Sequence, residues 1–251
     1  MTGLYFALVF VGPWLVARLI PEKSATFDVD DYLYEPMVLY NYYQSLLNAF
    51  MVWGLTHQVA ADVMGGEGPL FNTGSAFGRL WGRELSARDT ELAFFIWLHF
   101  HDKFCEFCDT LFMVLRRKND QLSFLHVVHH AIMPWAWYLV LVNAPTGDCF
   151  WGSSWNSFVH VVMYLYYGLR AMGVSVPWKK AVTQLQLVQF VCVALQSVYL
   201  SYLHLFHTSP YPLWLALVQF AVMTFFFVLF LQFSKKKYGN NKRGHKADKK
   251  D

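Results

Sequence analysis

Three histidines lie within five residues of one another, in the segment HVVHH, at His126, His129 and His130. Offsets of three and four residues place the three imidazoles on one side of a helix. Imidazoles grouped in this way can ligate a metal ion. Alternatively, one of them can act as a nucleophile while the others orient it and transfer protons. The pattern by itself leaves both kinds of chemistry open.

A second group of reactive side chains precedes the histidines. Lys103, Glu106 and Asp109 follow one another at spacings of three residues, so they share one face of a helix, and Thr110 lies beside them. A buried Lys103–Glu106 ion pair that only fixes helix packing is one interpretation, although desolvation makes such pairs poor stabilisers. Three ionisable groups on one face of an apolar helix exceed what packing requires and favour a catalytic or substrate-facing role.

Two further stripes of polar and aromatic side chains follow at helical spacing: Asn156, His160, Tyr164 and Tyr167, and then Thr183, Gln186 and Gln189. Buried amides need hydrogen-bond partners, and a polar stripe on a neighbouring helix supplies them. We therefore expect the four groups to face one another.

The elements that carry these residues are apolar helices. Of the 251 residues 56% are hydrophobic and only 15% are charged, whereas soluble domains carry roughly 25% charged residues. The sequence predicts an all-α polytopic membrane protein with seven transmembrane helices in a single bundle. The predicted spans are Thr2–Ile20, Pro36–Ala61, Glu91–Leu115, Leu122–Asn143, Ser153–Met172, Ala181–Leu203 and Pro212–Ser234. We assign residues 1–234 to the membrane domain and residues 235–251 to a basic, disordered cytosolic tail.

The distribution of Lys and Arg predicts the orientation of the bundle, because positive charges accumulate in cytosolic loops. With the C-terminus in the cytosol, 16 of the 20 Lys and Arg residues lie on the cytosolic side. The opposite side holds Arg79, Arg83 and Arg88, and Lys103 lies within the membrane. The four polar groups then fall in the cytosolic half of the bundle. A charged substrate group can reach them from the cytosol and an acyl chain from the bilayer.

Four motifs in this order resemble those of the ELO family of very-long-chain fatty acid elongases, the 3-ketoacyl-CoA synthases. They are KxxEFxDT from Lys103 to Thr110, HxxHH from His126 to His130, NSxVHVxMY from Asn156 to Tyr164, and TxxQxxQF from Thr183 to Phe190. Two features depart from the family pattern. Val128 stands where many members that act on polyunsaturated substrates have an aromatic residue, and the C-terminal lysines are not at the positions of a dilysine retrieval signal.

The resemblance implies a multi-pass protein of the endoplasmic reticulum membrane whose bundle encloses an acyl-chain tunnel. The implied reaction condenses a long-chain acyl-CoA, polyunsaturated chains included, with malonyl-CoA to give 3-ketoacyl-CoA, CO2 and CoA. No metal or other cofactor is expected. The expected partners are both CoA substrates, membrane lipid, the reductases and dehydratase of the elongation cycle, and a second copy in a homo-oligomer, but no nucleic acid.

We hypothesise that His129 is the catalytic nucleophile and forms an acyl-imidazole, because the chain offers no better-placed Ser or Cys in this region. His126, His130 and His160 would orient it and transfer protons. The substrate-binding or supporting residues are expected to be Lys103, Glu106, Asp109, Thr110, Asn156, Tyr164, Gln186 and Gln189. A concerted route with a histidine as general base is the alternative mechanism.

Two other functions compete with this assignment. Di-iron membrane desaturases and hydroxylases also use HxxHH boxes, but two such metals need about eight histidines in several boxes. This chain has ten histidines and one HxxHH, and His204 and His207 fall on the far side of the predicted membrane. A seven-span receptor or transporter would explain the helices but not three adjacent imidazoles on a cytosol-facing site.

Overall fold

The computed structural model describes residues 1–24, 26–65, 89–207 and 209–239, and all regular secondary structure within these ranges is helical. The helices are α1 (Thr2–Phe10), α2 (Gly12–Leu19), α3 (Val29–Gly65), α4 (Asp89–Cys105), α5 (Phe107–Leu115), the short 3-10 helix η1 (Asn119–Gln121), α6 (Phe124–Asn143), α7 (Cys149–Ala171), α8 (Lys179–His207) and α9 (Leu213–Gly239). The predicted all-α class is confirmed.

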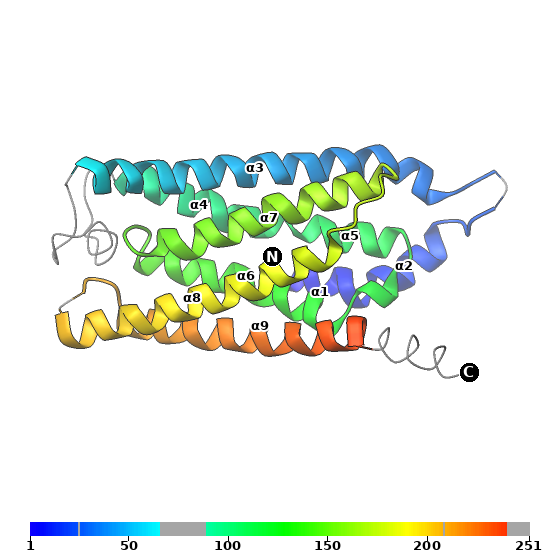
Figure 1. The fold of residues 1–251 in the computed structure, drawn as a ribbon. Helices are drawn as coiled ribbons and strands as arrows, with labels where there is room; N and C mark the ends of the chain where they lie inside the picture. Colours follow the sequence, from blue (N-terminus) through cyan, green and yellow to red (C-terminus); the bar gives the residue numbers. More distant parts are fainter. Residues whose placement is uncertain (25, 66–88, 208, 240–251) are drawn as a thin grey trace, which may run out of the picture.

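The long helices lie side by side along one direction and form an elongated bundle (Figure 1). Helix α3 packs along α7, α8 packs along α9, and α4 packs against α6. The α2–α3 connection, the α5–α6 turn, the α7–α8 connection and the end of α9 all lie at the same end of the bundle (Figure 1). These segments carry most of the described Lys and Arg residues, as the predicted orientation requires.

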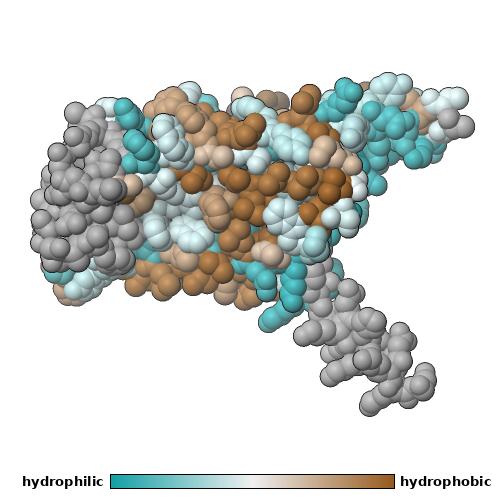
Figure 2. Space-filling model, turned by 45° about the horizontal axis from the view of Figure 1, so that its top comes forward, coloured by the Kyte–Doolittle hydropathy of each residue, from teal (hydrophilic) through white to brown (hydrophobic). Residues whose placement is uncertain are grey.

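The surface of the bundle is that of a helical membrane protein. Figure 2 shows hydrophobic side chains over the middle of the molecule and hydrophilic ones gathered at the end that holds the α2–α3 connection. Among the described residues, α6, α8 and α9 are long and apolar enough to cross a membrane. The pair α1 and α2, bent by 51° at its break, makes a fourth candidate if it is counted as one span.

The other predicted spans coincide with α3, the broken helix α4–α5, and α7. These helices carry buried polar residues that lower their hydropathy, among them Gln44 and Asn48 on α3 and Asn156 on α7. The structure shows the helices where the sequence predicts them. That each of them crosses the bilayer, giving seven crossings, stays a prediction.

Two helices extend more than four residues beyond the predicted segments. Helix α3 begins at Val29 and continues through Pro36, with Asp30 and Asp31 in its first turn, where acidic side chains interact favourably with the helix dipole. Helix α9 continues to Gly239, past the predicted domain boundary at residue 234. The predicted arginine-bearing loop and the remainder of the basic tail lie outside the described residues.

Helices α1 and α2 form the most irregular of the predicted spans. The break falls at Val11, and Pro13 stands in the first turn of α2, where its missing N–H is harmless. Near the start of α1, Thr2 accepts a 2.9 Å hydrogen bond from the indole of Trp135, which lies midway along α6. The first described turn of the chain therefore lies at mid-bundle depth, beside the middle of α6.

Candidate active site

The site is built around an interruption between α4 and α5. Helix α4 ends at Cys105 and α5 begins at Phe107, so Glu106 stands at the junction. The N–H of Glu106 still donates to the carbonyl of Asp102 at 3.0 Å, but the N–H of Asp109 donates to the carbonyl of Glu106, only three residues back, at 3.1 Å. This tighter turn changes the helical register between Lys103 and Asp109. The sequence predicts one continuous span here, and the interruption is a finding of the structure.

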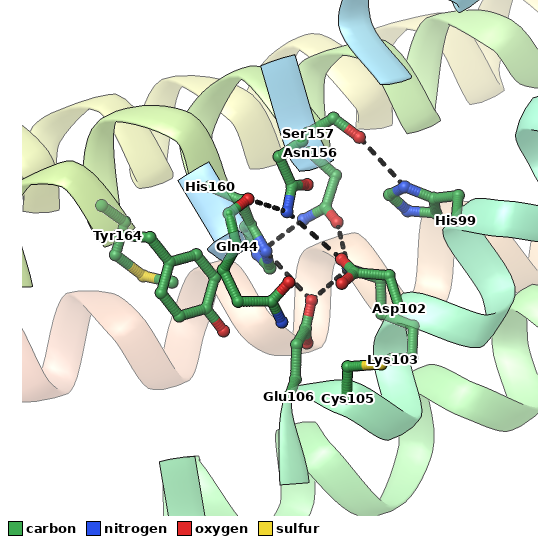
Figure 3. A network of polar contacts seen from close by, with 12 residues as sticks. Gln44, His99, Asp102, Lys103, Cys105, Glu106, Asn156, Ser157, His160 and Tyr164 are labelled. Carbon is green, nitrogen blue, oxygen red and sulfur yellow. Dashed lines mark hydrogen bonds and ion pairs between the residues drawn. The ribbon is translucent and has the colours of Figure 1, made fainter. Parts of the chain in front are cut away.

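Lys103 occupies the centre of a buried polar network between α3, α4 and α7 (Figure 3). Its Nζ lies 2.5 Å from Oε1 of Glu106 and donates to Oδ1 of Asn156 at 2.8 Å. Oδ2 of Asp102 lies 3.9 Å from the same ammonium. The side chain of Lys103 is only 1% exposed, so its charge depends on these three partners. The Lys103–Glu106 ion pair considered from the sequence is present.

His160 is held between two members of this network. Its Nδ1 lies 3.0 Å from Oε1 of Glu106, and its Nε2 lies 3.3 Å from Nδ2 of Asn156. The Asn156 contact is satisfied when Nε2 accepts from the Asn156 amide, which places the imidazole proton on Nδ1, the nitrogen nearer Glu106. Asn156 thus bridges Lys103 and His160, with its oxygen toward the lysine and its nitrogen toward the imidazole.

The three clustered histidines lie at the beginning of α6. Ser123 caps this helix by accepting a hydrogen bond from the N–H of His126 at 3.2 Å. The Nε2 atom of His126 lies 2.8 Å from the hydroxyl of Thr110 on α5. The ring centroids of His126 and His130 are 4.4 Å apart, and those of His129 and His130 are 5.2 Å apart. The imidazoles therefore form one group, tied to α5 through Thr110.

An apolar cavity lies between α6, α7, α8 and α9, and its first lining residue on α6, Met133, lies one turn beyond His129. Its empty volume is about 540 Å³, with open solvent at its mouth included. On α6 its lining includes Met133, Trp137 and Val140. These residues follow His129 at offsets of four, eight and eleven, so His129 lies on the same face of α6, one turn before the first lining residue. His129 is half-buried, and its ring lies 5.2 Å from that of Phe226 on α9.

Helix α7 also has a histidine one turn from its cavity-lining residues. Gly152 and Asn156 line the cavity, and His160 follows at the same four-residue spacing. Gln189 of α8 also lines the cavity. By contrast, the amide of Gln186 donates to Sδ of Met163 at 3.5 Å, and the hydroxyl of Thr183 donates back to its own helix at Lys179.

Asp109 belongs to a neighbouring contact set rather than to the Lys103 network. Its Oδ2 accepts a 2.7 Å hydrogen bond from the hydroxyl of Tyr164. The hydroxyl of Tyr164 lies 3.5 Å from that of Tyr40 on α3, which donates to the carbonyl of Cys105 at 3.3 Å. Two tyrosines thus link Asp109 to the α4–α5 junction.

Several members of the polar core were not singled out from the sequence. Asn48 donates to Oδ2 of Asp102 at 3.3 Å, and Nδ1 of His99 lies 3.0 Å from the hydroxyl of Ser157. Asn48 and Gln44 are spaced four residues apart within an apolar helix. The same spacing identified the other stripes, so this signal was available in the sequence.

Asp102, Glu106 and His160 are the described residues whose donor atoms approach one another closely enough to suggest a metal site, with all three atoms within 4.8 Å. The ammonium of Lys103, however, already contacts Glu106 and lies 3.9 Å from Asp102. A positively charged group therefore stands where a metal ion would have to bind. The donor set suits an internal ion pair better than a metal.

Comparison with known proteins gives a consistent result. The model of the ELO (GNS1/SUR4) family matches residues 1–246. The chain is 36% identical over 253 residues to very long chain fatty acid elongase 7 of Rattus norvegicus, covering 96% of this chain and 80% of that protein. It is 34% identical to elongase 4 of Mus musculus, with 97% and 72% covered. It is 42% identical over 153 residues to elongase 1 of Homo sapiens, with 59% and 53% covered.

Proposed function

Because this chain belongs to the ELO family of fatty acid elongases, as its four motifs indicate, we propose that it extends fatty acyl groups with His129 as the acyl-carrying nucleophile. The enzyme condenses acyl-CoA with malonyl-CoA and releases CO2 and CoA. The type of reaction follows from membership of the family. The assignment of His129 is our own inference from the geometry of the cavity.

One observation supports His129 over the neighbouring histidines: it lies on the face of α6 that lines the apolar cavity, one turn before the first lining residue, Met133. An acyl chain that lies in the cavity would bring its thioester carbonyl toward this ring. The Nε2 atom of His126 lies 2.8 Å from the hydroxyl of Thr110, and His130 is buried, whereas His129 is half-buried. Each enclosed CH2 contributes about 0.8 kcal/mol to binding, so the cavity can hold the chain in register with the nucleophile.

The proposed chemistry has three steps. A ring nitrogen of His129 attacks the thioester carbonyl of acyl-CoA, and the acyl-imidazole forms as CoA leaves with the imidazole proton. Malonyl-CoA then loses CO2 to give the enolate of its acetyl-CoA unit. The enolate carbon attacks the acyl-imidazole carbonyl, and His129 departs and takes one proton from solvent. The product is a 3-ketoacyl-CoA that is two carbons longer.

The remaining polar residues support these steps. The ring of His130 contacts both His129 and His126. His130 and His126 are therefore placed to relay the proton of His129. Asn156 and Gln189 line the cavity and offer amide donors to a developing oxyanion. Glu106 and Lys103 hold His160 and Asn156 in place, and Asp109, Tyr164 and Thr110 fix the neighbouring helices.

The cellular setting completes the proposal. We place the protein in the endoplasmic reticulum membrane with its C-terminus in the cytosol, because the basic connections gather at one end of the bundle. Its product requires a reductase, a dehydratase and a second reductase, and these enzymes are the expected partners. Self-association and the use of polyunsaturated acyl chains belong to the same proposal. No resident metal is invoked, since the ammonium of Lys103 already lies beside these carboxylates.

Intact mass after incubation with acyl-CoA alone tests the covalent step. We expect a mass increase of one acyl group in the wild type and none in His129→Ala, with His204→Ala as a control histidine at the far end of α8. Turnover without any adduct on the wild type, even after rapid quenching, would favour concerted condensation with a histidine as base. An adduct retained in His129→Ala would assign the nucleophile to another residue.

A further inference from the structure

Helices α1 and α2 bury one stripe of side chains against the rest of the bundle. The buried residues are Tyr5 and Val9 on α1, followed by Gly12 and Val16 on α2. Offsets of four, three and four residues place them on one helical face. This face packs against α5 and α6, and a Cβ atom at Gly12 would lie only 3.0 Å from Cγ1 of Val114 on α5. Tyr5 is the polar member of this otherwise apolar stripe.

The side chain of Tyr5 reaches the group of clustered histidines. It is 1% exposed, and its ring centroid lies 4.6 Å from that of Phe107 and 6.2 Å from that of His130. The hydroxyl of Tyr5 accepts a hydrogen bond from the hydroxyl of Thr110 at 3.5 Å. Packing against Phe107 requires only a phenyl ring, and a buried tyrosine hydroxyl needs a polar partner. The hydroxyl of Tyr5 therefore calls for an explanation other than packing.

Thr110 lies between Tyr5 and His126 and has a single hydroxyl proton to donate. When this proton points to Tyr5, the oxygen of Thr110 can accept from a protonated Nε2 of His126, which lies 2.8 Å away. Thr110 is fully buried, so bulk water does not compete for either hydrogen bond. A neutral imidazole with its proton on Nε2 has its lone pair on Nδ1. His126 can then take up a proton through Nδ1, as a relay requires.

We propose that Tyr5 is a positioning residue for the condensation reaction and that, through Thr110, it holds His126 in the tautomer with its proton on Nε2. This inference rests on the proposed function, because it assumes that His126 relays a proton. Without the Tyr5 hydroxyl, the Thr110 proton is free to turn toward Nε2 of His126. The imidazole proton then moves to Nδ1 and blocks the nitrogen that receives the relayed proton. Helix α1 thus contributes a side chain to the arrangement of the active site.

Tyr5→Phe tests the hydroxyl while it keeps a ring packed against Phe107. We expect the rate of condensation to fall about two- to fivefold, as for the loss of one hydrogen bond, with the KM for acyl-CoA unchanged. The pH–rate profile should shift as well. Thr2→Val is the matched control on the same helix, because it removes the hydrogen bond that α1 accepts from Trp135 and does not touch the histidines. This control should leave both the rate and the pH–rate profile unchanged.

A double variant separates action through Thr110 from a general effect of α1. Tyr5→Phe should cause no further loss of rate in the Thr110→Val protein, because the residue that transmits its effect is already altered. Histidine-selective 15N NMR gives a direct readout of the tautomer, and the signals absent from His126→Gln identify His126. Its protonated nitrogen should change from Nε2 in the wild type to Nδ1 in Tyr5→Phe.

Two outcomes would overturn the role of Tyr5. One is that the losses of Tyr5→Phe and Thr110→Val multiply in the double variant, and the other is that the His126 spectrum of Tyr5→Phe equals that of the wild type. A wild-type rate in His126→Gln would instead contradict the proposed relay on which this inference rests. Absence of condensation by the wild type with any acyl-CoA would contradict the proposed function itself.

Discussion

Lys103 donates a 2.8 Å hydrogen bond to Oδ1 of Asn156, and this bond decides which end of the Asn156 amide faces His160. The nitrogen end lies 3.3 Å from Nε2 of His160. His160 can then accept through Nε2, which places its proton on Nδ1, 3.0 Å from Oε1 of Glu106. Lys103 on α4 therefore selects the tautomer of His160 on α7 through Asn156, which lies between them.

Asn156→Asp tests this selection. The carboxylate still accepts from Lys103, but it has no N–H to donate to Nε2 of His160, so the preferred tautomer is lost. We expect the rate of condensation to fall by about 10²-fold, as for other mispositioned acid–base groups. The overall helical content and elution volume should remain those of the wild type. Steady-state rates with one acyl-CoA and circular dichroism provide the measurements.

A comparison with Asn156→Ala separates tautomer selection from simple packing. Alanine also removes the acceptor of Lys103, so this variant should lose thermal stability in addition to activity. If Asn156→Asp retains wild-type activity, the donation from Asn156 to His160 has no role in catalysis.

Thr110→Val is expected to weaken the positioning of His126. The Thr110 hydroxyl lies 2.8 Å from Nε2 of His126, so it joins α5 to the histidine group by a hydrogen bond. Valine keeps the shape but removes the hydrogen bond, which contributes about 0.5–1.5 kcal/mol. We expect the rate to fall by up to about tenfold, with little change in the KM for acyl-CoA.

Thr110→Ser is the conservative counterpart and should retain most of the activity, because its hydroxyl can reach the same ring nitrogen. A pH–rate profile adds a readout that packing alone would not move. The pH values at which the rate rises and falls should shift in Thr110→Val and stay unchanged in Thr110→Ser. Equal rates and profiles for all three proteins would remove His126 from the catalytic group.

The parts of the site that follow from local spacing could be predicted from the sequence, and the parts that depend on contacts between helices could not. Lys103 and Glu106 pair because residues three apart meet on any helix. The contact of Lys103 with Asn156 joins residues 53 positions apart, and only the packing of α4 against α7 creates it. The sequence around Glu106 contains no proline or glycine that would predict the interruption between α4 and α5. Asp102 was missed because it lies off the three-residue series of Lys103, Glu106 and Asp109.

The contact between Arg116 and Asp30 predicts how stability depends on pH at the basic end of the bundle. Nε and Nη2 of Arg116 donate to the two carboxylate oxygens of Asp30 at 2.7 and 3.2 Å. These hydrogen bonds hold the pKa of Asp30 below its ordinary value. A lowered native pKa stabilises the folded state fully above the unfolded pKa of about 3.9, and this contribution is lost as the pH falls through the native pKa.

We therefore expect Asp30→Asn to lower the free energy of unfolding by less than about 1 kcal/mol at pH 7, since the pair is partly exposed to solvent. The difference from the wild type should shrink as the pH is lowered below about 4. Thermal unfolding in detergent at a series of pH values measures both effects. A difference that grows with acid would contradict the assigned direction. Asp31→Asn, in the same helical turn, controls for the loss of a charge near the α3 N-terminus.

Lys103→Met should be the most damaging single change in the polar core. Methionine approximates the length of the lysine side chain but leaves Glu106 and Asp102 buried without their cation. Breaking one side of a buried ion pair typically costs about 3–5 kcal/mol. We expect a large fall in the melting temperature of the detergent-solubilised protein, together with loss of condensation activity.

The double variant Lys103→Met/Glu106→Gln distinguishes the structural role of the ion pair from its catalytic role. Removing both charges should restore part of the lost stability, because position 106 no longer carries the desolvation cost of an unpaired carboxylate, although Asp102 still does. Activity should remain low, since His160 loses the carboxylate that lies 3.0 Å from its Nδ1. Recovery of both stability and activity would assign the pair to packing alone. A Lys103→Met protein as stable as the wild type would show that the ammonium is not needed to neutralise this cluster.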